Sequence, residues 1–230
     1  MSHGHWIVNR VIFGQEMSFN MDTLVAMWAA MAFLLIVSFI ATRKISIFPT
    51  KLQLFFEKIL GFFSGLLDGM IHEGGRKHFP LVASLFLFIV TANLMGQLPL
   101  KMIELKHGEI ASPTNDINLT AALAIIVLVY YVGFGIAKKK TKFLLHEFSF
   151  MGIISMLVEI LELVTRPLTL ALRLFGNILA GEILVSVLLG LCAWGLPLPA
   201  MLFEVFVACV QALVFTMLTT VYIATAVNEH

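Results

Sequence analysis

The sequence predicts an all-α membrane protein with about five bilayer-spanning helices, an interfacial amphipathic helix, and a long tilted antiparallel hairpin made by the last two helices. Hydrophobic residues make up 60% of the 230 residues and charged residues 13%, whereas a soluble domain averages about 45–50% and about 25%. The mean hydropathy is +0.97. These values exclude a soluble enzyme and a disordered tail, and the net charge of +1 argues against a nucleic-acid surface.

The charges that remain are gathered in short stretches, and the intervals between them are long enough to cross a hydrocarbon core of about 30 Å. These intervals define the N-terminal half of the chain. We expect an outer tail at residues 1–22, spans at 23–42, 78–98 and 117–137, and an interfacial helix at 50–72.

The segment 50–72 differs from the spans because four charged residues interrupt its apolar sequence. Such a pattern is typical of a helix that lies on the membrane surface. Gly61, Gly65 and Gly69 are spaced four apart, and they leave open a second interpretation in which they form a close helix-packing face.

Residues 148–230 are predicted to form the hairpin. The stretch 148–191 is far longer than a perpendicular span requires, and strong tilt accommodates such excess length. Gly195, Pro197 and Pro199 then predict a turn, after which the last helix runs from about residue 199 to residue 227.

The loop charges predict the orientation in the membrane. The loop after the first span is basic, residues 101–116 hold two lysines against three acids, and residues 138–142 hold four lysines. Basic loops face the cytoplasm. The N-terminus is therefore expected outside and the C-terminus inside. In the second loop, Asp116 is expected to cap the helix that begins near Ile117.

Polar side chains in the hairpin are the candidate site, because a charge at the centre of a span costs about 2.5–3.5 kcal/mol. At 100° per residue, five of them share one stripe of the first hairpin helix, and Glu182 lies half a turn away. Glu204, Gln211 and Tyr222 share a face of the last helix. The stripe consists of Glu159, Glu162, Arg166, Arg173 and Asn177.

In an antiparallel pair, residues at equal depth have position numbers with a constant sum. This rule predicts three layers: Glu182 with Glu204, Arg173 with Gln211, and Glu162 with Tyr222. Acids on both sides of a permanently charged arginine are what an interrupted ion path requires, with two half-channels and a barrier between them. For Glu162 and Arg166 the four-residue spacing leaves a structural ion pair equally open.

Several motifs resemble subunit a of F-type ATP synthases, from about residue 23 onward. The matching runs are RPLTLALRLFGN at 166–177, AGE at 180–182, QALVFTML at 211–218, PTNDINLT at 113–120 and NLM at 93–95. The run at 113–120 is closest to the cyanobacterial and plastid branch. The resemblance implies a stator subunit that carries ions past a rotating ring of small hairpin subunits.

The resemblance also implies roles. Arg173 corresponds to the family's essential arginine, which faces the ring carboxylate, and Glu182 corresponds to the acid of the outer half-channel. Gln211 and Asn177 correspond to polar groups near the arginine, and Glu159, with Glu162, lies toward the cytoplasmic exit.

Glu204 is a departure from part of the family, because some bacterial members carry histidine there. None of the seven histidines lies deep in a predicted span, so we expect the acid pair of Glu182 and Glu204 to share a proton or to coordinate a cation. The choice between H⁺ and Na⁺ stays open. Asn93 and Tyr222 are further candidates, and for Asn93 a helix–helix hydrogen bond is an equal alternative to lining the outer channel.

The implied partners are the c-ring, the b-type peripheral stalk, the F1 head indirectly, and the lipid bilayer, with no nucleic acid, metal or cofactor. The subunit is not expected to be an enzyme by itself. The expected location is a bacterial plasma membrane, with the thylakoid membrane as the alternative.

Three other functions are compatible with a membrane chain of this composition. A secondary transporter fits less well because no internal repeat relates the two halves. An intramembrane enzyme lacks H-E-x-x-H, G-x-S-x-G and a P-loop in this sequence. A purely structural membrane subunit, in which arginine only pairs with glutamate, is the third.

Overall fold

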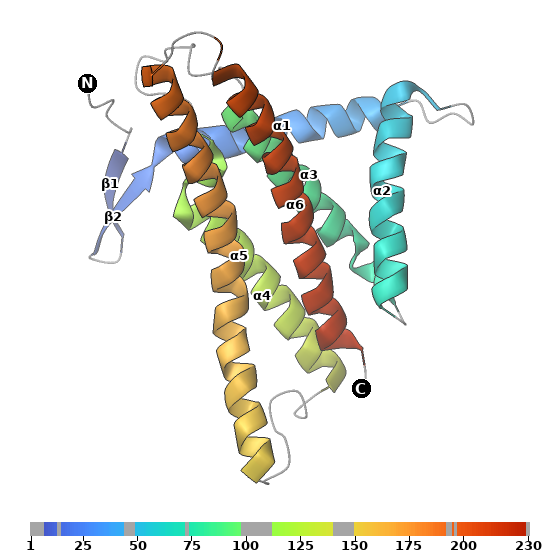
Figure 1. The fold of residues 1–230 in the computed structure, drawn as a ribbon. Coiled ribbons are helices and arrows are strands. Elements are labelled where there is room, and N and C mark those ends of the chain that lie inside the picture. Colours follow the sequence, from blue (N-terminus) through green and yellow to red (C-terminus); the bar gives the residue numbers. More distant parts are fainter. Residues whose placement is uncertain are drawn as a thin grey trace.

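The computed structural model describes residues 7–12, 15–43, 49–71, 74–97, 112–139, 150–191, 195 and 197–228. Most of this part of the chain is helical (Figure 1). The helices are α1 (Met21–Thr42), α2 (Lys51–Met70), α3 (Phe79–Gln97), α4 (Ile117–Lys139), α5 (Phe150–Leu191) and α6 (Pro197–Val227). The short 3-10 helices η1 (Gly75–Lys77) and η3 (Pro113–Asn115) precede α3 and α4.

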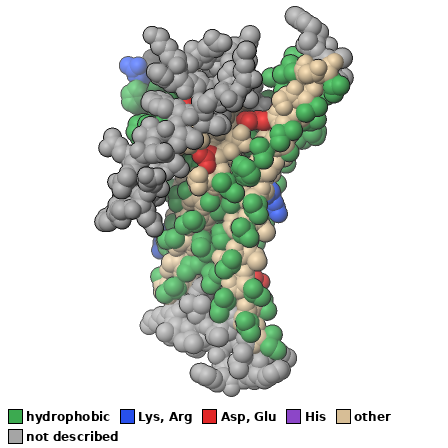
Figure 2. Space-filling view, turned by 90° about the vertical axis from the view of Figure 1, so that its left-hand side faces the viewer, with side chains coloured by type: hydrophobic (Ala, Val, Ile, Leu, Met, Phe, Trp, Pro, Cys, Tyr) green, Lys and Arg blue, Asp and Glu red, His purple; other side chains and the backbone are tan. Residues whose placement is uncertain are grey.

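Five helices, α1 and α3 to α6, contain segments long and apolar enough to cross a membrane. The predicted class, an all-α membrane protein with about five helices of spanning length, is confirmed. Side chains on one side of the molecule are mostly hydrophobic, and the charged groups there stand as isolated patches (Figure 2). An exposed surface of this kind is typical of contact with lipid or with other membrane helices.

Two short strands precede α1, and the sequence interpretation of residues 1–22 as a tail did not include them. β1 (Ile7–Ile12) pairs antiparallel with β2 (Gln15–Asn20), in a register that places Ile7 opposite Asn20 and Ile12 opposite Gln15. The β-branched residues of β1 favour an extended backbone. Only two residues separate the strands, a length typical of a hairpin.

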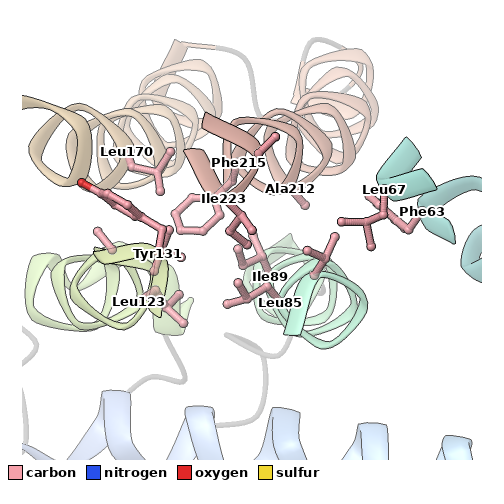
Figure 3. Close-up of a cluster of buried hydrophobic side chains, with 14 of the residues drawn as sticks. Phe63, Leu67, Leu85, Ile89, Leu123, Tyr131, Leu170, Ala212, Phe215 and Ile223 are labelled. Carbon is pink, nitrogen blue, oxygen red and sulfur yellow. The ribbon is translucent and has the colours of Figure 1, made fainter. Parts of the chain in front are cut away.

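α1 crosses the other long helices steeply. It runs across the molecule in Figure 1, whereas α2, α5 and α6 run along it. The close-up in Figure 3 agrees, because α1 lies across the bottom of a view that looks along the bundle. Within the described residues, α1 buries only Ala26 and Ala30, while Trp28 is 65% and Leu35 is 71% exposed.

α2 is amphipathic, as the pattern of segment 50–72 predicts. Thr50 begins it by accepting a hydrogen bond from the Gln53 backbone N–H at 3.4 Å. Its buried face carries Phe63 and Leu67, and the helix packs against α3 and α6. The glycines at 61, 65 and 69 lie elsewhere: a Cβ added to any of them would meet no atom within 4 Å. Within the described chain they therefore pack against no other helix.

α6 is the central helix of the bundle, because it packs against α3, α4 and α5. Its buried residues include Ala212, Phe215 and Ile223, which meet Leu85 and Ile89 of α3 and side chains of α4 and α5 in one apolar core (Figure 3). This core leaves one flank of α5 uncovered, and Arg173 of the polar stripe is exposed there.

The hairpin helices are much longer than a perpendicular span. α5 has 42 residues, or about 63 Å at 1.5 Å per residue. α6 has 31 residues and begins at Pro197, two residues before the expected start. A proline at the first helical position is favourable because its missing N–H has no intrahelical partner there. Residues 148 and 149, at the expected start of the hairpin, lie outside the described residues.

Candidate functional site

Glu204 lies against the α5 backbone beside Glu182, near the end where α5 and α6 are connected. Glu204 on α6 is 8% exposed. A Cβ added to Gly181 would lie 2.1 Å from Glu204 Oε1, so the Glu204 carboxyl lies directly against the α5 backbone one residue before Glu182. This matches the depth that the position sums predict for the two acids, which we call the acid pair.

Glu182 of the acid pair is held by the segment before α4. Asn115 Nδ2 donates a 2.7 Å hydrogen bond to Glu182 Oε2. Ser112 Oγ donates to the Ala92 carbonyl of α3 at 3.3 Å. We call residues 112–116 the linking turn, because they join α3, α4, α5 and, through Asp116, α1.

Asp116 caps α4, as the sequence predicts. Its Oδ1 accepts from the Asn118 backbone N–H at 2.9 Å, and its Oδ2 accepts from Thr23 Oγ1 of α1 at 3.1 Å. The cap is therefore confirmed, and the same side chain ties the start of α1 to the linking turn.

Two buried amides lie on the α3–α6 side of the hairpin. Asn93 of α3 is fully buried and donates from Nδ2 to the Ala208 carbonyl of α6 at 3.2 Å. The helix–helix hydrogen bond considered for Asn93 is thus present. Gln211, one turn beyond Ala208, is buried, and its Nε2 has no hydrogen-bond partner among the described residues. Asn93 Oδ1 is likewise unpartnered there, so both amides retain capacity to bind water.

Arg173 is exposed on the uncovered flank of α5. Its neighbours Leu170 and Leu174 are buried in the core, so the helix turns the guanidinium away from the bundle. No acid, amide or carbonyl of the described residues bonds to it. Gln211, its predicted partner in depth, is buried on α6 and makes no hydrogen bond to it. Asn177, one turn further, is half-buried and also makes no side-chain hydrogen bond within the described chain.

At the opposite end of the hairpin, Glu162 and Arg166 form the ion pair that their spacing predicts. The Arg166 guanidinium carbon lies 5.0 Å from the centre of the Tyr222 ring, an arrangement that favours a cation. The Tyr222 and Tyr131 rings are 6.1 Å apart. Figure 3 shows the Tyr131 hydroxyl pointing toward α5, and it has no hydrogen-bond partner among the described residues. The side chain of Glu159 lies outside the described residues.

Three residues of this arrangement were missed by the sequence reasoning about the site. In the sequence Asn115 and Gly181 stand out only as members of the motifs at 113–120 and 180–182, and Tyr131 does not stand out at all. A glycine before a polar helix residue is a weak signal of close approach, and nothing in the sequence relates Tyr131 to Arg166, which is 35 positions away.

Metal binding has no support in the described part of the chain, where no group of three or more His, Cys, Asp and Glu side chains comes together. His78 is the one histidine there. It lies at the start of α3, where its Nδ1 is 3.1 Å from the Tyr130 hydroxyl, and it does not reach the acid pair.

Comparison with known proteins identifies what the chain is similar to. The family model described as ATP synthase A chain matches residues 24–224. ATP synthase subunit a of Gloeobacter violaceus is 40% identical over 215 residues, which cover 93% of this chain and 87% of that relative.

Proposed function

This chain belongs to the ATP synthase subunit a family, and from that premise we propose that it carries ions through two offset half-channels to and from the rotating c-ring. It is a membrane-embedded component of the ion-translocating sector of ATP synthase, not the subunit that makes ATP. The observation that carries the proposal is Arg173: a permanent charge on the outside of an apolar helix, with no counter-ion among the described residues.

The position of Arg173 requires an anion from another subunit. An arginine near the centre of a spanning helix costs about 2.5–3.5 kcal/mol on insertion scales, and an arginine that faces outward cannot recover this from its own bundle. A carboxylate on a neighbouring ring would supply the missing partner. Because the guanidinium does not lose its proton, it also blocks a direct cation path along the hairpin.

The acids on either side of Arg173 provide the two half-channels of the proposal. A proton enters from outside by way of Glu204 and Glu182 and neutralises a ring carboxylate. The neutral carboxyl then turns through lipid until it returns to the other side of Arg173, which favours the charged form. The proton leaves toward Glu162 and Glu159, with Asn177, Gln211 and Tyr222 lining the path. The driving force is about 2.3 kcal/mol per charge per 100 mV.

The geometry of the helices supports this use of the hairpin. If α1, about 33 Å long, crosses the bilayer along its normal, then α5 and α6 must lie strongly tilted, because they cross α1 steeply (Figure 1). A tilted α5 runs beside several ring helices instead of one. In the same frame α2 lies along the membrane surface, which fits its amphipathic pattern. The basic loops favour an orientation with the N-terminus outside.

The location proposed is a bacterial plasma membrane, with the c-ring and the b-type stalk as direct neighbours and the F1 head as an indirect one. The rival function of a purely structural subunit is favoured only at Arg166, where the ion pair with Glu162 is complete. It does not explain Arg173, which has no acid to pair with among the described residues.

Replacement of Arg173 by alanine tests the proposal. In vesicles that contain the whole ATP synthase, Arg173→Ala should abolish proton-driven ATP synthesis while passive proton flow persists or rises. Arg76→Ala is the matched control: Arg76 is exposed and only 4.0 Å from Asp68 in a weak surface pair, so synthesis should stay near normal. Proton-driven synthesis by the Arg173→Ala enzyme would refute the proposed function.

A further inference from the structure

The linking turn is a rigid platform beside the acid pair. Thr114 is fully buried, and its hydroxyl lies 2.8 Å from Ser112 Oγ. A Cβ added to Gly96 would lie 2.3 Å from the Ser112 Cβ, so α3 and the turn are in the closest contact that a glycine permits. Asp116 fixes the other end of the turn to α1 and α4. A side chain carried by this turn is therefore held in a defined place.

Asn115 is that side chain, and it reaches α5. Its Nδ2 donates to Glu182 Oε2 at 2.7 Å, at the short end of the range for an amide donor. An amide N–H can only donate, and a hydrogen bond to an ionised carboxylate is shorter and about twice as strong as one between neutral groups. The bond therefore favours Glu182 in its charged form.

Glu204 differs from Glu182 in having no described donor at its carboxyl. Its carboxyl is buried against Gly181, and Oε1 has no hydrogen-bond partner among the described residues. A buried carboxylate without a donor is costly, and binding a proton removes the charge.

We propose that Asn115 is a positioning residue of the outer half-channel, which holds the Glu182 carboxylate in place to take the incoming proton from Glu204. This inference rests on the proposed function. In the step that follows, the O–H bond of Glu204 breaks and an O–H bond forms on Glu182, which hands the proton to a ring carboxylate. Glu204 is then ionised and takes the next proton from outside.

Few other charged groups bear on the acid pair in the described chain. The linking turn contributes Asp116, which is occupied with Thr23 and Asn118, and α1 contributes Asp22 beside Thr23. The described side chains of α4 include no Asp, Glu, Lys or Arg. On α6, Glu204 is the one charged residue of the helix. The donor on Asn115 is thus one asymmetry between the two acids.

The pH dependence of proton-driven ATP synthesis tests this inference. The whole enzyme is reconstituted in liposomes, the membrane potential is held constant, and the pH on the outer half-channel side is varied. Asn115→Leu should move the pH midpoint upward by about one unit, because the lost donor favoured the ionised acid. Asn115→Asp should move it further in the same direction, since it adds a negative charge.

Asn118→Leu is the matched control. The Asn118 amide donates to Asp116 Oδ1 at 3.0 Å and does not contact Glu182, so the midpoint should not move. A loss of rate in Asn115→Leu that is equal at every pH would overturn the inference, as would an equal shift in the control. The proposed function fails separately, by the Arg173→Ala result, whatever the Asn115 variants show.

Discussion

Gly181 lets the Glu204 carboxyl lie against the α5 backbone, and its replacement by alanine tests the geometry of the outer path. The added Cβ would lie 2.1 Å from Oε1, 2.6 Å from Cδ and 2.9 Å from Cγ of Glu204. Ordinary contact between such atoms begins at about 3.4 Å, so the carboxyl must retreat by about 1.3 Å. A misplacement of about 1 Å in a reacting group can cost about 100-fold in rate. We therefore expect the rate of ATP-driven proton pumping to fall by roughly 10- to 100-fold.

Gly190→Ala is the control on the same helix. A Cβ there meets no atom within 4 Å, and alanine gains the same helix propensity, about 0.5–1 kcal/mol over glycine. The double variant Gly181→Ala with Glu204→Asp should recover part of the pumping, since aspartate is shorter by one methylene. Pumping is measured in inverted vesicles by the quenching of a pH-sensitive dye. Equal rates in Gly181→Ala and Gly190→Ala would refute the assigned contact.

Two further predictions concern residues around the site. Asn93→Leu removes the hydrogen bond to the Ala208 carbonyl. It should lower the stability of the detergent-solubilised complex by about 0.6 kcal/mol, an average for such bonds between membrane helices. Unchanged proton pumping in this variant would assign Asn93 a packing role, whereas a large loss of pumping would assign it to the channel. Asp116→Ala removes the α4 cap and the hydrogen bond from Thr23, and it should lower the stability of the protein by about 0.5–2 kcal/mol, as measured by thermal inactivation. Thr225→Val is the control, because the Thr225 hydroxyl is exposed and bonded within its own helix.

The residues of the hairpin show how far sequence reasoning reaches. Glu162 and Arg166 are four apart, so a single helix brings them together whatever the fold, and the ion pair follows. The contact of Glu204 with the backbone beside Glu182 also follows from counting along two antiparallel helices joined by a short turn. Both predictions need only a helix period and a direction.

Side-chain exposure around the hairpin could not be predicted from the helix period and direction. The layers paired Arg173 with Gln211 by depth, but Arg173 is exposed on α5 and Gln211 is buried on α6. Depth along a hairpin is a property of two helices, whereas the direction of a side chain depends on which faces α3 and α4 cover. The glycines of α2 show the same limit, since their spacing defines a helix face but not the neighbour of that face.

Composition and period alone determined that this chain is a bundle of membrane helices, which few positions carry charge, and which of those charges share a helix face. The tertiary structure decided that Asn115, 67 positions before Glu182, supplies its hydrogen bond, and that Arg173 faces outward without a partner in the described chain. The physical reason is range: helix periodicity is local and can be read from spacing, whereas a contact between distant segments exists only once a whole bundle has packed.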